Sequence, residues 1–310
     1  MKRVGILGIE GGGISTEWVP NFAAEFRRHG FVEGRNLEII FFAVPSTGPR
    51  GPLSFAELRE GSRKKAAEMV AAGLDCMVAN GEPHTRFLQE ASRVIPTVVD
   101  VPDPVGLGFV PSLSKPGGNL TGLHDGREEV CLKTAELFRK LIPGLQCAGW
   151  IGPENFRRSG EAFEAGVRKL GMRFQAVSIR NAERADVQRV GRELAALKRE
   201  GCVALQVEFF GPQHEAIVAD AVANRIALSG YRADQLGFLF AYSPVRLPEH
   251  EAVRRVPAIV ARILRGEWPG DIPFEGPSRY HLTLNLKTAA QLGIKVPADV
   301  RVLADEVIPA

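Results

Sequence analysis

The sequence predicts an α/β protein built from two lobes, because strand-like and helix-like segments alternate along the chain and the alternation starts again near residue 122. Short apolar runs, typical of buried strands, are followed by longer segments with apolar residues at helical spacing. Such alternation favours a parallel sheet covered by helices on both faces. A chain of 310 residues is long enough for two lobes of roughly 150 residues each.

The first half contains four expected strands separated by helices. Gly30 follows the first helix and Pro83 stands in the first turn of the third, where these residue types are favoured. The expected strands cover residues 4–9, 37–43, 74–79 and 97–101. The expected helices cover residues 18–26, 57–72 and 83–93.

The second half repeats this alternation and then continues into a final strand and helix. Asn285 precedes the final helix and is expected to cap it. The expected strands cover residues 147–151, 173–179, 203–207, 226–229, 238–242 and 280–285. The expected helices cover residues 128–141, 160–170, 185–199, 213–224, 249–264 and 286–292.

Two segments rich in glycine and proline are expected to connect the lobes. Residues 115–122 (KPGGNLTG) lie between the halves and are expected to form a hinge turn, and residues 271–277 (DIPFEGP) precede the final strand. A chain that returns to an earlier lobe needs several crossovers, and such connections allow two lobes to close on a ligand. The expected division is residues 1–121 with 243–274, and residues 122–242 with 275–310.

Composition argues against partners that require a strongly charged or strongly apolar surface. The net charge is +3, and the basic residues are scattered rather than gathered into the stripe that a nucleic-acid groove needs. No segment approaches the ~18 apolar residues of a membrane span. The first ten residues fit a short strand better than a signal peptide, so either the chain is cytoplasmic or its signal has been removed.

Motifs for catalysis, metal binding and cofactor binding are missing from the sequence. The glycines at 11–13 are not followed by the Lys-Ser or Lys-Thr of a phosphate-binding loop, and Thr16 stands where the last glycine of a dinucleotide motif belongs. The six histidines never fall four residues apart, and the four cysteines lack metal-ligand spacing. We therefore expect no enzyme activity, no cofactor and no metal. Cys76, Cys147 and Cys202 are expected to be small buried apolar residues.

Ligands of parallel sheets bind at the carboxyl ends of the strands, which selects the candidate binding residues. These loops hold carboxylates, hydroxyls and aromatic rings, which suit non-covalent recognition of a small polar or zwitterionic molecule. Helix N-termini can bind a carboxylate and Asp103 an ammonium, although Asp before proline also commonly starts a turn. The candidates are Ser15, Thr16, Asn80, Gly81, Glu82, Asp103, Asn155, Glu208, Phe210 and Tyr231.

Five short motifs, in this order, carry a resemblance that covers nearly the whole chain. They are GFVEGRN at 30–36, DPVG at 103–106, KPGGNLTG at 115–122, NLKTA with LGI at 285–294, and ADEVI at 304–308. In these motifs the sequence resembles the ABC-transporter substrate-binding proteins that include bacterial tryptophan and phenylalanine binders.

The resemblance implies the type I periplasmic-binding-protein fold, in which two Rossmann-like lobes are joined by three hinge crossovers with a ligand cleft between them. It implies an amino acid or similar small ligand that is delivered to an ABC-transporter permease, an extracytoplasmic location and a monomer. A cytoplasmic ligand sensor of the same fold and, less favoured, an enzyme on a two-lobed scaffold remain as alternatives.

The sequence departs from the family pattern at the expected cleft. A loop that usually reads Ser-Gly-Thr-Pro is here residues 80–83 (NGEP), and a strand end that often reads Trp-Asn-Pro is here residues 151–153 (IGP). These changes predict an altered ligand on a retained fold. Glu82 and Glu208 together would favour a cationic or polyhydroxylated ligand. Replacement of Asp103 by alanine is expected to weaken binding with little loss of folding.

Overall fold

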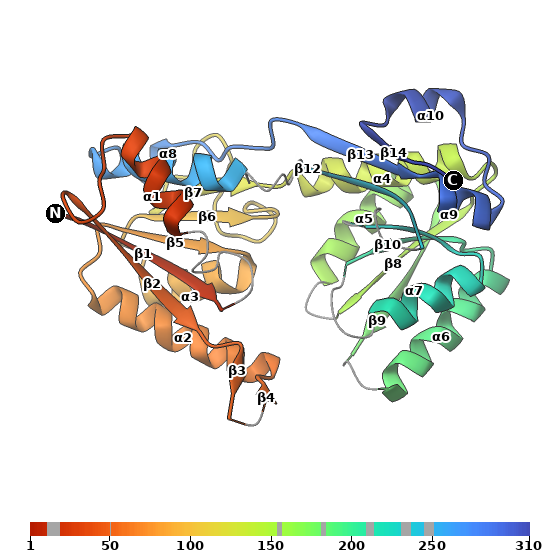
Figure 1. Cartoon of the computed structure of the whole chain (residues 1–310), viewed down its shortest axis with the longest axis horizontal. Helices are drawn as coiled ribbons and strands as arrows, with labels where there is room; N and C mark the ends of the chain where they lie inside the picture. The colour runs from red at the N-terminus through yellow and green to blue at the C-terminus, as the bar shows by residue number, and fades with distance from the viewer. Residues whose placement is uncertain are drawn as a thin grey trace. The chain divides into compact units, whose positions relative to one another are not determined.

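The computed structural model describes residues 1–10, 19–49, 51–153, 157–180, 184–208, 214–230, 237–244 and 251–310. The chain forms two compact units, each a sheet with helices packed on it (Figure 1). Unit 1 is Met1–Gly126 with Val245–Ser278, and unit 2 is Arg127–Pro244 with Arg279–Ala310. The chain therefore passes between the units three times.

Unit 1 has a five-stranded parallel sheet with the strand order β2-β1-β5-β6-β7. Helices α1 and α8 bury apolar residues against one face, and helices α2 and α3 cover the other. The strands are β1 Lys2–Ile9, β2 Leu37–Val44, β5 Cys76–Asn80, β6 Thr97–Val101 and β7 Leu120–His124, with a two-residue pair β3 Thr47–Gly48 and β4 Gly51–Pro52 outside the sheet. The helices are α1 Val19–Arg28, α2 Phe55–Ala71, α3 Glu82–Ala91, α8 Glu251–Leu264 and the short 3-10 turn η3 Pro269–Asp271.

Unit 2 has a seven-stranded sheet with the order β14-β13-β12-β11-β10-β8-β9, in which only the β12–β13 pair is antiparallel. Helices α4, α5 and α9 pack on one face, and α6 and α7 on the other. The strands are β8 Cys147–Pro153, β9 Arg173–Ile179, β10 Ala204–Val207, β11 Ala227–Ser229, β12 Phe238–Pro244, β13 Tyr280–Asn285 and β14 Glu306–Ile308. The helices are α4 Arg127–Leu141, α5 Arg157–Lys169, α6 Arg184–Arg199, α7 His214–Ala223, α9 Leu286–Leu292 and α10 Ala298–Leu303.

This architecture confirms the predicted α/β class with two parallel-sheet lobes. Local signals act at the helix ends as the sequence suggests. Ser54 and Glu57 form a reciprocal capping box before α2, and the Asn285 side chain accepts the Thr288 N–H at the start of α9. Gly293 ends α9 in the left-handed conformation, with φ of 71°.

The prediction of a hinge turn at residues 115–122 is wrong for the end of that segment, which belongs to strand β7. Leu120 and Thr121 are buried, and β7 pairs in parallel with β6. Gly122 has a φ of 151°, and a side chain there would bring Cβ within 1.8 Å of the Val99 carbonyl oxygen. The glycine therefore permits the close approach of β6 and β7. The glycines and proline of this segment resemble a turn, so the sequence did not indicate this role. The short elements α10 and β14 also escaped prediction.

Candidate functional site

In unit 1, the turn from β5 into α3 is bound to the end of the neighbouring strand β6. The Gly81 N–H donates to the Asp100 carbonyl oxygen at 2.8 Å, and the Asn80 side-chain amide donates to the Asp100 carboxylate at 3.1 Å. Gly81 has a φ of 80°, which favours glycine at this position. Asn80 and Gly81 therefore lie together at the carboxyl edge of the sheet, as predicted.

The first turn of α3 presents the positive end of a helix at this edge. Its N-cap is Gly81, which has no side chain to accept the first N–H groups of the helix. Glu82 lies in that turn, and its carboxylate pairs with Arg86 at 2.9 Å. Burial lowers the pKa of His84, and the nearby Asn80 carbonyl opposes this shift only in part. Near neutral pH the turn therefore carries no uncompensated side-chain charge.

Asp103 follows β6 and closes a turn. Its Oδ1 accepts the Gly106 N–H at 2.8 Å, and a Cβ on Gly106 would lie 1.9 Å from its Oδ2. The turn interpretation of this residue is thus correct. Its predicted contact with a ligand ammonium stays a prediction.

Two connections out of unit 1 are tied to each other beside this edge. The His124 N–H donates to the Glu275 carbonyl oxygen at 3.0 Å, and His124 Nδ1 accepts the Gly126 N–H at 3.2 Å. Arg255 of α8 binds the Glu275 carboxylate at 2.8 Å. Burial lowers the pKa of His124, while the charges of Asp125 and Asp103 oppose that shift.

In unit 2, Glu208 follows β10 and forms an ion pair that the sequence did not reveal. Its Oε1 lies 2.6 Å from Arg127 Nη1, and the two side chains are 4% and 10% exposed. The same guanidinium nitrogen donates to Ser159 Oγ at 3.2 Å. Arg127 is 81 residues distant in sequence, so no local spacing could have identified it. Both Glu82 and Glu208 are therefore balanced by arginines of their own units.

On strands β8 and β10, two buried polar atoms have no hydrogen-bond partner within the described part of the chain. They are Trp150 Nε1 and Gln206 Oε1, on side chains of residues that are 2% and 6% exposed. Trp150 of β8 and Gln206 of β10 are register partners on adjacent strands. Two adjacent strands thus carry, at the same register position, one buried donor and one buried acceptor.

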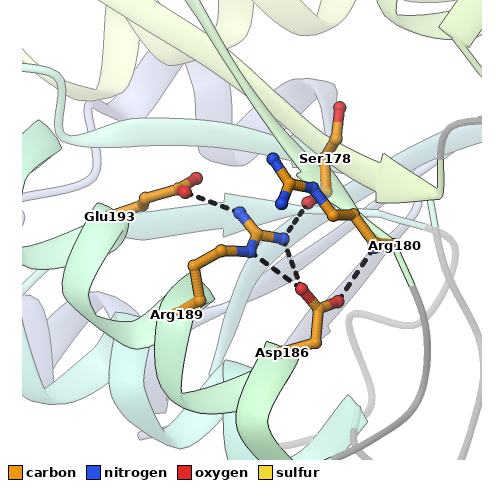
Figure 2. A network of polar contacts seen from close by, with 5 residues as sticks. All are labelled: Ser178, Arg180, Asp186, Arg189 and Glu193. Atoms are coloured by element: carbon orange, nitrogen blue, oxygen red, sulfur yellow. Dashed lines mark hydrogen bonds and ion pairs between the residues drawn. The ribbon is translucent and has the colours of Figure 1, made fainter.

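A second polar cluster joins the end of β9 to α6 (Figure 2). The Asp186 carboxylate accepts the Arg180 N–H at 2.8 Å and binds Arg189 at 2.7 Å. Arg189 also binds Glu193 and the Ser178 carbonyl oxygen. Burial alone would lower the pKa of Arg189, but Glu193 and Asp186 raise it, so the guanidinium stays charged. These contacts hold the end of β9 against helix α6.

Five of the predicted binding residues lie outside the described residues: Ser15, Thr16, Asn155, Phe210 and Tyr231. All four cysteines are buried, which confirms the prediction for Cys76, Cys147 and Cys202. Burial raises the pKa of the Cys76 thiol, which disfavours the reactive thiolate. Within the described ranges, no group of three or more His, Cys, Asp or Glu side chains could hold a metal, and no helix has the length and apolar character of a membrane span.

Known proteins resemble this chain in both fold and sequence. A crystal structure of an ABC domain in complex with L-Trp from Streptococcus pneumonia superposes with a TM-score of 0.75 at 20% identity, covering 99% of each chain. A ligand-free, open substrate-binding protein with adhesive properties from Clostridium difficile gives 0.69 at 18% identity over the whole of both chains. At these identities the likeness is evidence of the fold alone.

A curated relative adds sequence similarity over a shorter stretch. It is a tyrosine-binding protein from Clostridioides difficile, 30% identical over 123 residues, and the match takes in 39% of this chain and 32% of that protein. Residues 59–308 match the family described as ABC transporter substrate binding protein. Since that match spans most of the 310 residues, the chain belongs to the family of ABC-transporter substrate-binding proteins.

Proposed function

We propose that this protein is the substrate-binding component of an ABC importer and that it binds an amino acid, with aromatic amino acids as the first candidates. The family match over residues 59–308 is the observation that carries this proposal. The names of two similar proteins, one in complex with L-Trp and one a tyrosine-binding protein, suggest the ligand class.

The charges at the strand ends favour a zwitterion over a polycation. Glu82 is already paired with Arg86, and Glu208 is already paired with Arg127. A polyamine would have to compete with a covalently tethered guanidinium at each carboxylate. A single ligand carboxylate, by contrast, has a suitable partner in the first turn of α3, whose N–H groups lack acceptors inside the helix. Asp103, which is half-buried, is the candidate partner of the ligand ammonium.

The three chain crossings are the proposed hinges. Ligand binding to one unit would be followed by closure of the other, and the closed form would present the surface that a membrane permease recognises. We propose an extracytoplasmic location and a monomeric state, as is usual for this role. The protein would release its ligand chemically unchanged, so it would not act as an enzyme.

A thermal-shift screen of the purified protein against the common L-amino acids, polyamines and sugars tests this proposal. An amino acid present at about 100 times its dissociation constant should add about 2.7 kcal/mol of stability. Asp103→Ala should weaken binding of that amino acid about tenfold or more, because an ammonium would lose its charged partner. Glu60→Ala, an exposed loss of a carboxylate on α2 of the same unit, is the control and should bind normally.

Two results would contradict the proposal. A shift with polyamines or sugars and none with amino acids would refute the ligand class. Conversion of the added amino acid into another compound would refute the binding-protein role. Unchanged affinity in Asp103→Ala would mean that Asp103 stabilises its turn and does not bind the ligand.

A further inference from the structure

The side chains of Trp150, Gln206 and Glu208 share one face of the unit 2 sheet. Residues two apart on a strand point to the same side, so Gln206 and Glu208 face the same layer. Trp150 is the register partner of Gln206 on the adjacent strand and belongs to the core beneath α4 and α5. Arg127 of α4 and Ser159 of α5 contact each other in this layer and complete the set.

Two members of this set are poorly explained by folding alone. Buried indole N–H and amide oxygen atoms almost always find hydrogen-bond partners, and each one left without a partner destabilises the fold. Trp150 Nε1 and Gln206 Oε1 have none within the described residues. Phenylalanine and leucine would fill the same volume without that penalty. The polar atoms therefore require another reason.

The indole is also fitted closely at the strand end. A Cβ added to Gly152 would lie 2.3 Å from Trp150 Cζ2, and one added to Gly160 would lie 2.9 Å from its Cδ2. Gly152 lies two residues closer to the carboxyl end of β8, the edge at which ligands of parallel sheets bind. Both glycines thus make room for an indole beside the expected binding edge.

The charge balance defines what this group of residues can bind. Glu208 and Arg127 neutralise each other, and among the described residues of this set the unpartnered atoms are one donor, Trp150 Nε1, and one acceptor, Gln206 Oε1. We propose that Trp150 and Gln206 form a subsite of unit 2 for an uncharged ligand group that both accepts and donates a hydrogen bond, a hydroxyl or a carboxamide. Trp150 Nε1 donates to that group and Gln206 Oε1 accepts from it. This inference rests on the proposed function, since it names the side-chain chemistry of the amino acid bound there.

Matched pairs of ligands test the subsite. The pairs are L-tyrosine with L-phenylalanine, L-glutamine with L-methionine, and L-serine with L-alanine, titrated calorimetrically into the wild-type protein. In at least one pair the hydroxyl or carboxamide member should bind about tenfold more tightly, as expected for two added hydrogen bonds. Gln206→Leu and Trp150→Phe should each reduce that preference to about threefold or less while retaining the other member's affinity.

A control and a stability measurement separate binding from folding. Gln175→Leu makes the same chemical change in β9 of the same sheet and should keep the wild-type preference. Gln206→Leu should unfold at the wild-type temperature or above it in the absence of ligand, because it removes an unpaired buried acceptor. A clear decrease in that temperature would identify Gln206 as a structural residue and overturn the proposal.

The outcomes also distinguish the two proposals. Equal affinities within every pair, or a preference that survives both substitutions, would refute the subsite and leave the amino-acid binding role intact. Absence of binding by all six, together with no thermal shift from any other L-amino acid, would contradict the proposed function and the subsite together.

Discussion

Two arginine–carboxylate clusters of unit 2 differ in how they are built. The Asp186 cluster joins residues that are close in sequence, at the end of β9 and in the following helix α6 (Figure 2). The Glu208 cluster joins Arg127, Ser159 and Glu208 from three distant segments, and on β8 and β10 of the same sheet two buried atoms lack a hydrogen-bond partner among the described residues. The first cluster therefore has the features of contacts that only stabilise the fold. The unpartnered atoms of Trp150 and Gln206 have no such structural explanation, and a ligand can use their hydrogen-bonding capacity.

The largest expected effect is on the more deeply buried pair. Glu208→Ala should lower the free energy of unfolding by about 3–5 kcal/mol, because the buried Arg127 loses its counter-ion. The double replacement Arg127→Met with Glu208→Leu should regain most of that loss, since it removes both charges. Urea denaturation measures both variants. A loss below about 1 kcal/mol in Glu208→Ala would mean that the pair is effectively solvated.

Substitutions in the Asp186 cluster should lower the free energy of unfolding and leave ligand affinity unchanged. Asp186→Ala should cost about 2–4 kcal/mol, somewhat less because the Arg189 side chain is 20% exposed. Glu193→Ala removes a 42% exposed partner of the same arginine and should cost less than about 1 kcal/mol. Calorimetric affinity for the amino acid should be unchanged in both. Weakened binding in Asp186→Ala would remove the distinction between the clusters.

The smallest expected effect is a change of stability with pH, which we expect to arise from histidines of unit 1 and not from the arginine–carboxylate pairs of unit 2. Arginine–carboxylate pairs keep their charges between about pH 5 and 8, whereas burial lowers the pKa of His84 and His124 in unit 1 below the ordinary value of 6.5. In the unfolded chain these histidines bind protons at a pH where the folded protein keeps them neutral. Stability should therefore be full above about pH 6.5 and decrease as the pH falls below it.

Urea titrations at about pH 7.5 and 5.5 measure this decrease. The double variant His84→Gln with His124→Gln should show a weaker dependence on pH than the wild type. An equal dependence in both proteins would assign the effect to other groups.

The sequence predicted the fold more completely than the site. Strand and helix segments follow from apolar periodicity, and the Ser54 and Asn285 caps follow from local spacing. Strand β7 was misassigned because the glycines of its motif resemble a turn, whereas Gly122 serves close packing against Val99.

At the site, the general rule for parallel sheets selected Asn80, Gly81 and Glu208 correctly as strand-end residues. The partners of Glu208 could not be predicted, since Arg127 and Ser159 reach it only through the tertiary fold. The same reason explains why Trp150 and Gln206 passed as ordinary strand residues, because their pairing is a property of sheet register. The ion pairs of Arg189 in the Asp186 cluster, by contrast, have the i, i+3 and i, i+4 spacing of helix pairs.

Calorimetric titration of L-tyrosine and L-tryptophan into the wild-type protein tests the central claim most directly. We predict saturable binding of at least one of them, with one ligand per chain, and recovery of the same amino acid after denaturation. Lack of saturable binding by either, together with no thermal shift from any other amino acid, would contradict the claim that this chain is an amino-acid-binding protein.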